Sequence, residues 1–138
     1  MIKKIFLIYF FLLSFSQLYG QANYFDDGKK FFNNKKYAES KFMFEKDIVY
    51  NPKNELSYLY LAKIFNQQSK NDLEENNLNT VILLNPKNEE AIYLLALLSI
   101  KNSDFTKTRE LIDTLTLVCK KLCSKQKELN KKLENSLK

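Results

Sequence analysis

The chain has 138 residues, enough for a single domain, and its two glycines and two prolines leave room for few turns, so we expect an all-α protein. Histidine is absent, which removes the commonest general base and metal ligand, and we therefore expect no enzymatic activity, no cofactor and no metal site. The net charge of +6 resides mostly in residues 119–138, so the sequence lacks the basic face over a whole domain that is typical of nucleic-acid-binding proteins.

The first 22 residues, 1–22, have the layout of a secretory signal peptide. Two lysines precede the apolar run Ile5–Leu13, and the small residues Gly20 and Ala22 supply a cleavage site, with cleavage expected after Ala22 or otherwise after Gly20. Polar residues interrupt the run before it reaches the roughly 20 apolar residues that span a bilayer. The alternative is an uncleaved membrane anchor formed by residues 5–19.

Further along the chain, apolar residues fall three or four positions apart, which is the period of an α-helix. The Asn-Pro pairs are expected to end helices near Tyr50 and Leu84, because proline cannot donate a backbone hydrogen bond and pushes its predecessor out of the helical region. Acidic residues after each pair favour the N-terminus of the next helix. The predicted helices are 23–33, 38–50, 55–67, 72–84, 89–101, 105–118 and 124–137.

A repeat is visible in the tetrapeptide Asn-Pro-Lys-Asn, which occurs at Asn51–Asn54 and again 34 residues later at Asn85–Asn88. Aligning the chain on itself at this offset brings the small residues Gly28, Ala62 and Ala96 into one column, where two helices would approach closely. In the first two units an aromatic residue follows three positions later. The spacing predicts three units of similar structure.

These features together resemble the tetratricopeptide repeat, which has a period of 34 residues and two antiparallel helices in each unit. The resemblance covers residues 21–122, of which 23–122 belong to the mature chain, and implies a right-handed α-solenoid of three helical hairpins. Asn71 and Glu74 stand where an aromatic and a small residue are usual, and the third unit lacks its proline. An unrelated helical bundle is the alternative. The expected units are 21–54, 55–88 and 89–122.

The last segment, 123–138, is predicted to be a capping helix. Leu129, Leu133 and Leu137 form a narrow apolar stripe on it, with lysines elsewhere. Repeat arrays need a terminal helix with a polar outer side, because the last unit cannot bury its own apolar face. A basic amphipathic helix lying on a membrane surface is the competing interpretation.

The two cysteines, Cys119 and Cys123, fall where the third unit should close. An even number of cysteines in an exported chain favours a disulfide, and a spacing of four on a helix brings the α-carbons within bridging range. We expect a bridge that replaces the missing proline and holds the capping helix to the last hairpin. Two free, buried thiols are the alternative.

The resemblance also implies a binding groove, because the first helix of each such unit lines a concave surface. Phe25, Tyr60 and Glu90 stand where the chaperone-binding members carry the polar residues that clamp a terminal carboxylate, so recognition of an acidic tail is not expected. The predicted groove is apolar and aromatic. Its residues are Phe25, Lys29, Phe32, Leu56, Leu59, Tyr60, Lys63, Asn66, Glu90, Tyr93, Leu97 and Ile100.

The function implied by the resemblance is that of a scaffold or adaptor that binds a protein or peptide partner in this groove. With the signal peptide it would be an exported protein, expected in a bacterial periplasm or otherwise secreted. One alternative is a peripheral membrane protein held by the basic C-terminal helix or by an uncleaved signal segment. Self-association through the groove or an end face, and redox chemistry at the two cysteines, are the others.

Overall fold

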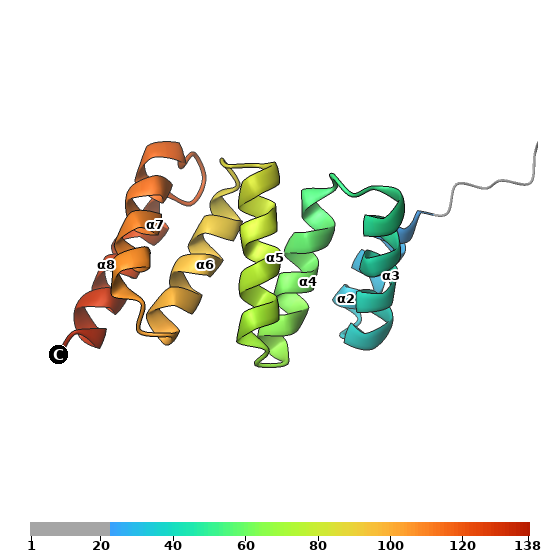
Figure 1. Ribbon diagram of the computed structural model, residues 1–138, viewed down its shortest axis with the longest axis horizontal. Helices are drawn as coiled ribbons and strands as arrows, with labels where there is room; N and C mark the ends of the chain where they lie inside the picture. Colours follow the sequence, from blue (N-terminus) through green and yellow to red (C-terminus); the bar gives the residue numbers. More distant parts are fainter. Residues whose placement is uncertain (1–22) are drawn as a thin grey trace, which may run out of the picture.

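The computed structural model describes residues 23–138, and the predicted signal peptide lies outside the described residues. Within them the chain forms seven α-helices and no strand (Figure 1). The all-α solenoid predicted from the repeat is therefore confirmed. The helices are α2 (Tyr24–Asn33), α3 (Tyr37–Tyr50), α4 (Glu55–Gln67), α5 (Asn71–Leu84), α6 (Glu89–Lys101), α7 (Phe105–Val118) and α8 (Cys123–Ser136).

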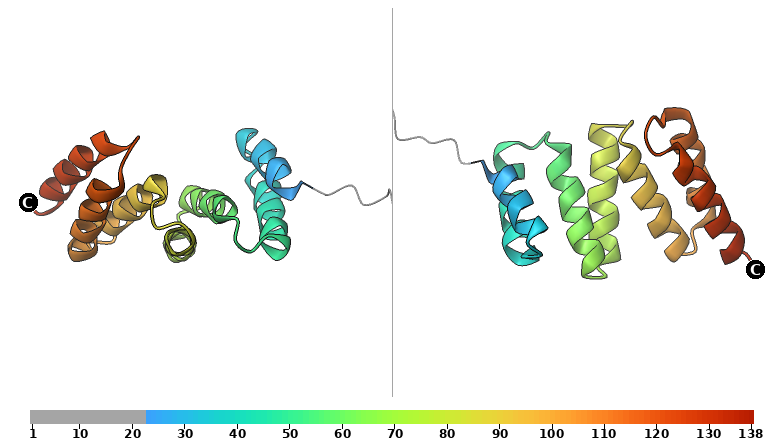
Figure 2. Two further views of the ribbon diagram at one scale, coloured as in Figure 1. Left: turned by 90° about the horizontal axis from the view of Figure 1, so that it is seen from above. Right: turned by 180° about the vertical axis from the view of Figure 1, so that it is seen from behind.

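The helices pair into three hairpins that stack in chain order. Helix α2 packs on α3, α4 on α5 and α6 on α7, and each hairpin contacts the next through α3 with α4 and α5 with α6. Figure 2 (left) shows α2, α4, α6 and α8 on one side of the array, with α2 and α8 rising at its two ends. This side is therefore concave, and α3, α5 and α7 form the convex outer side.

The prolines act as helix terminators. Helices α3 and α5 end at Tyr50 and Leu84, each two residues before a proline, as the sequence predicts. The last asparagine of each tetrapeptide then caps the following helix, because the Asn54 side chain accepts the backbone N–H of Leu56 and the Asn88 side chain accepts that of Ala91. One short motif thus ends one hairpin and begins the next.

The column of small residues lies where the two helices of a hairpin cross. Gly28, Ala62 and Ala96 are all buried. A Cβ on Gly28 would lie 2.7 Å from Cε1 of Phe44, a fully buried ring, so only glycine fits beside that side chain. The close approach expected from this column is therefore present in the first hairpin.

Helix α8 covers the end of the array, where it contacts both α6 and α7. Leu129 and Leu133 are buried there against Ile92, Ala96 and other apolar residues of the last hairpin. Leu137 was expected in the same stripe, but it follows the end of α8 and is 52% exposed. Among residues 23–138, no helix has the length and apolar character needed to cross a membrane.

Candidate functional site

The concave side carries a cluster of aromatic side chains at its N-terminal end. Phe25 and Phe32 of α2 meet Tyr60 of α4 edge to face, with ring centroids 6.0 Å and 5.1 Å from that of Tyr60. Tyr60 in turn stacks on the buried ring of Phe44 at 4.9 Å. Because such pairs hold each ring at a defined angle, this aromatic cluster is a rigid, half-buried surface.

Two lysines border the aromatic cluster. Lys29 Nζ lies 5.3 Å from the centroid of the Phe25 ring, and Lys63 Nζ lies 4.8 Å from that of Tyr60, so both make cation–π contacts. Lys63 also forms a 2.8 Å ion pair with Glu90 of α6. Lys29 has no acidic side chain within ion-pair distance in the described residues, and its charge remains available.

Not every predicted groove residue lies on this surface. Leu59 is 3% exposed and packs between hairpins with Leu78 and Val81, so its assignment to the groove was wrong. The reason is that α4 lies between α3 and α5, so most of its circumference is covered. Leu56, by contrast, is exposed.

The third unit's contribution is reduced in the same way. Leu97 and Ile100 pack against the apolar cluster that α8 completes with Leu129 and Leu133, so the capping helix covers part of their apolar surface.

Asn66 of the second unit forms hydrogen bonds within its own hairpin. Its amide donates to both carboxylate oxygens of Glu74, at 3.0 Å and 3.1 Å.

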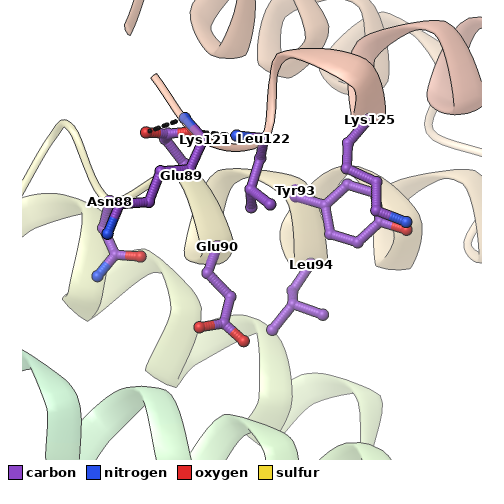
Figure 3. A pocket seen from close by; sticks show the side chains of 8 residues that line it. All are labelled: Asn88, Glu89, Glu90, Tyr93, Leu94, Lys121, Leu122 and Lys125. Carbon is purple, nitrogen blue, oxygen red and sulfur yellow. Dashed lines mark hydrogen bonds between the residues drawn. The ribbon is translucent and has the colours of Figure 1, made fainter. Parts of the chain in front are cut away.

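A pocket of about 620 Å³ lies on the same side, between the N-terminal half of α6 and the start of α8 (Figure 3). Tyr93 lies at one end of the lining residues, with the amine of Lys125 beside the ring, 5.2 Å from the ring centroid. The pocket therefore pairs an aromatic wall with charged groups from two helices. Its lining residues are Asn88, Glu89, Glu90, Tyr93, Leu94, Lys121, Leu122 and Lys125.

Glu128 of α8 orders the far wall of this pocket. It accepts a 2.9 Å hydrogen bond from the Tyr93 hydroxyl and a 2.7 Å bond from Lys125 Nζ. Burial, followed by the nearby carboxylate, raises the pKa of Tyr93, and the bond to Glu128 raises the pKa of Lys125. The bonds from Lys125 and Tyr93 lower the pKa of Glu128. At neutral pH the three groups are therefore a neutral phenol between a cation and an anion.

Glu89 joins the pocket to the turn that precedes α8. Its carboxylate accepts the backbone N–H groups of Lys120 at 2.9 Å, Lys121 at 3.0 Å and Leu122 at 2.6 Å. These bonds, the one from Leu122 first, lower the pKa of Glu89. The carboxylate of α6 thus stands before the N-terminus of α8, where a negative charge is favoured.

The cysteines lie at the same turn. Cys119 follows the end of α7 and Cys123 is the first residue of α8, and the structure pairs them in a disulfide with α-carbons 5.2 Å apart. The helix is interrupted between them, so the bridge closes a turn and does not lie along one continuous helix. It holds the start of α8 beside the end of α7.

The sequence analysis missed the part that α8 contributes, chiefly Lys125 and Glu128. A signal for it exists, because extending the 34-residue offset once more places the start of α8 at Cys123, in register with Glu89 at the start of α6. Helix α8 therefore occupies the position of the first helix in a fourth unit. Such helices line the concave side, so its side chains belong to the candidate site.

Acidic residues outside this site serve the fold. Asp47 is buried and accepts hydrogen bonds from the side chains of Asn51, Asn54 and Ser57.

Between Asn23 and Lys138, the structure has no group of three or more histidine, cysteine, aspartate or glutamate side chains that could hold a metal ion.

No protein family model and no curated protein matches this sequence. Solved structures do match. The first TPR of Spaghetti (RPAP3) bound to the HSP90 peptide SRMEEVD has a TM-score of 0.73 and 18% identity, over 83% of this chain and 90% of that one. The Yersinia enterocolitica type III secretion chaperone SycD, in complex with a peptide of the translocator YopD, has a TM-score of 0.73 and 10% identity, over 83% and 89%.

A tetratricopeptide repeat protein from Parabacteroides merdae has a TM-score of 0.79 and 19% identity over 88% of this chain. The chain spans about half of that protein, 48% of its length. At these identities the likeness concerns the fold. This likeness agrees with the 34-residue period, with the paired helices and with the prolines that end the first two units. The chain therefore has the fold of the tetratricopeptide repeat domains.

Proposed function

We propose that this protein is an exported scaffold or adaptor that binds a segment of another protein on its concave side. The observation that carries the proposal is that the aromatic cluster and the pocket beside Tyr93 lie on the same side of the array and are joined by the ion pair between Lys63 and Glu90. Exposed aromatic and apolar surface of this kind marks interaction sites. Solved proteins of the same fold carry peptides, as SycD and the first TPR of Spaghetti do.

The chemistry of the surface favours an apolar or amphipathic segment. Phe25, Phe32 and Tyr60 offer ring surface, while Glu90 neutralises Lys63 through their ion pair. Of the two lysines that border the aromatic cluster, Lys29 is left to attract an acidic group near the N-terminal end. A helix or extended strand with an apolar face and few charges fits this description better than an acidic tail.

Site-specific photocrosslinking tests the location. The photoreactive residue p-benzoylphenylalanine replaces Lys29 or Lys63 on the concave side, and Asn79 or Asp113 on the convex side as matched exposed controls. We expect one adduct of defined mass from the two concave positions and none from the convex ones. Adducts that form only from the convex positions would move the partner site to the other side of the array.

A second experiment tests the chemistry of the surface. Lys29→Glu reverses the available charge beside the aromatic cluster, and we expect it to reduce the adduct formed from position 63. Lys70→Glu, an exposed lysine in the turn between α4 and α5, is the matched control and should leave the adduct unchanged. Equal adduct in both variants would remove Lys29 from the site.

Export is the second part of the proposal and rests on residues 1–22. We propose that the segment directs the chain to a bacterial periplasm and is removed after Ala22. Cell fractionation with mass spectrometry of the intact protein tests this, with a mature chain beginning at Asn23 as the expected result. A chain that retains its N-terminus in the membrane fraction would favour the anchored form.

The competing function, attachment to a membrane through α8, lacks its main support. Such a helix needs a free apolar stripe, and Leu129 and Leu133 are buried against the last hairpin. The packing of α8 as a capping helix explains why residues 129 and 133 are leucines.

A further inference from the structure

The convex side carries a row of apolar side chains that the fold does not use. Val49, Leu83 and Leu117 lie 34 residues apart, near the ends of α3, α5 and α7, and are 77%, 81% and 87% exposed. Tyr50 and Leu84, the residues that follow the first two, are exposed as well. The same position of every unit thus presents an apolar side chain to solvent.

The helical period explains why these residues are exposed. The residues two positions earlier, Asp47, Val81 and Leu115, are all buried. Two residues correspond to about 200° of rotation around an α-helix, so side chains two positions after a buried one point away from the core. A polar residue would serve the fold equally well at such a position, which makes the apolar choice in all three units informative.

The charges near this row are mostly positive, and the two carboxylates that directly follow its turns, Glu55 and Glu89, are hydrogen-bonded to Asn85 and to the backbone N–H groups of residues 120–122. The corresponding windows 46–54, 80–88 and 114–122 contain five lysines and one acidic residue, Asp47, which is buried and hydrogen-bonded. Figure 1 shows the ends of α3, α5 and α7 and the turns that follow them together at one edge of the array, the upper edge in that view. We call this edge the basic rim. Its lysines are Lys46, Lys53, Lys87, Lys120 and Lys121.

We propose that the basic rim docks on the surface of a lipid bilayer that contains anionic phospholipids. Protruding aliphatic side chains in a row can enter the apolar boundary of the bilayer, and lysines beside them meet the headgroup phosphates. A second copy of the chain fits less well, because pairing two such edges would bring lysines against lysines. A partner helix needs a groove, whereas these side chains protrude.

This docking goes beyond the proposed function and is compatible with it. The basic rim lies on the convex helices and their turns, while the aromatic cluster lies on the concave side. A chain held at the rim would therefore keep the aromatic cluster open to a protein partner, whereas Lys121 belongs both to the rim and to the wall of the pocket. The proposal is independent of α8, whose apolar stripe is already covered.

The chain contains no tryptophan, so a single introduced one reports on its own position. Leu83→Trp places it on the basic rim, and Gln67→Trp places it at the exposed end of α4, at the opposite edge (Figure 1). The full-length variants are mixed with vesicles of phosphatidylcholine and phosphatidylglycerol that carry brominated acyl chains. The apolar run in residues 1–22 can itself bind vesicles, so total binding does not test the proposal. The test is which of the two tryptophan positions is quenched.

We expect the tryptophan at position 83 to shift to shorter emission wavelength and to be quenched, and that at position 67 to do neither. Vesicles of phosphatidylcholine alone should quench neither. Adding Lys87→Gln to the Leu83→Trp variant should lower the ratio of quenched to unquenched tryptophan about fivefold, the factor that corresponds to about 1 kcal/mol for a lysine at an anionic surface. Lys70→Gln, away from the rim, is the matched control and should leave the ratio unchanged.

Three results would overturn the proposal. The first is equal quenching at positions 83 and 67, and the second is quenching at position 83 that is the same without phosphatidylglycerol. The third is a dimer in light scattering that Leu83→Asp abolishes, together with no quenching at position 83, which would assign the row to self-association.

Discussion

The turns that close the units and the turns inside the hairpins keep their geometry by different means. Each internal turn has one residue in the left-handed region, Lys35, Ser69 and Ser103, with φ of 58°, 54° and 58°. Each also repeats the same backbone hydrogen bond, from Lys36 N–H to Phe31 C=O in the first unit and at the equivalent positions of the others. This is the Schellman arrangement, which usually has glycine at the left-handed position.

The closing turns differ from one another in chemistry. The first is held by Asp47, which accepts three side-chain hydrogen bonds, and the second by Asn85, which donates to Glu55 at the start of the same unit. The third has no proline and uses Glu89 with three backbone N–H groups, together with the bridge between the cysteines. Backbone bonds make the internal turns tolerant of sequence, whereas the closing turns depend on particular side chains.

The largest effect should come from the first closing turn. Asp47→Ala leaves the buried hydroxyl of Ser57 and the part-buried amide donors of Asn51 and Asn54 without their acceptor, and we expect a loss of about 3 kcal/mol in the free energy of unfolding. Urea denaturation followed by circular dichroism measures it. Asp113→Ala, an exposed aspartate on α7, is the matched control. A loss no greater than that of the control would show that the side chains of this turn do not hold it.

The disulfide should contribute less. Replacing Cys119 and Cys123 together by serine opens a loop of only a few residues, and the chain-entropy relation gives a loss of about 2 kcal/mol. Helicity should stay unchanged, because α8 remains packed through Leu129 and Leu133. Mass spectrometry of the unreduced protein after alkylation checks the pairing itself, and two alkylated thiols would contradict it.

The third closing turn should also respond to acid. Because the folded pKa of Glu89 lies below its ordinary value of 4.5, its carboxylate stabilises the fold above that pH. The contribution is lost as pH falls through the lowered value. Glu89→Gln should therefore flatten the acid side of a stability–pH curve, measured as urea midpoints. Glu110→Gln, at an exposed site on α7, should leave the slope as it is in the unsubstituted protein.

Glu74 should show the opposite pH dependence. It is 2% exposed beside the second internal turn, and burial raises its pKa above 4.5 despite the bond from Asn66. The stabilisation present when it is protonated disappears as pH rises through the raised pKa. Glu74→Gln, which can still accept from Asn66, should be more stable at neutral pH and equal below pH 4.5. A variant that is less stable at neutral pH would contradict this.

The smallest effect should come from the internal turns. Lys35→Gly removes the steric cost of a side chain in the left-handed region and should raise stability by about 1 kcal/mol or less. Asn34→Gly, one position earlier at a φ of −87°, is the matched control and should lower stability slightly. If both changes have the same sign, the left-handed position is not strained.

The helices could be predicted almost to the residue, because the sequence has physical markers for the position of each helix and for the ends of two of them. The period of the apolar residues locates each helix, and Pro52 and Pro86 fix the ends of α3 and α5. The internal turns could not be recognised by their residues, since lysine and serine at the left-handed positions give no signal that glycine would have given.

The candidate site was harder to predict, because burial depends on what surrounds a helix. Helix α4 has apolar residues almost all around, so the sequence alone did not separate buried Leu59 from half-exposed Tyr60. Leu83 resembles a core residue in the sequence, and only the packing of α5 reveals it on the outside. The pocket beside Tyr93 needs α8 in place, which the offset of 34 residues predicts only when it is carried past the third unit.

The disulfide spans only the turn between α7 and α8, while Glu89 and the buried leucines of α8 fasten the same helix without it. A reductant would therefore make the protein easier to unfold and leave its shape unchanged. The fold can form before the thiols are oxidised, on either side of a membrane that separates a reducing compartment from an oxidising one.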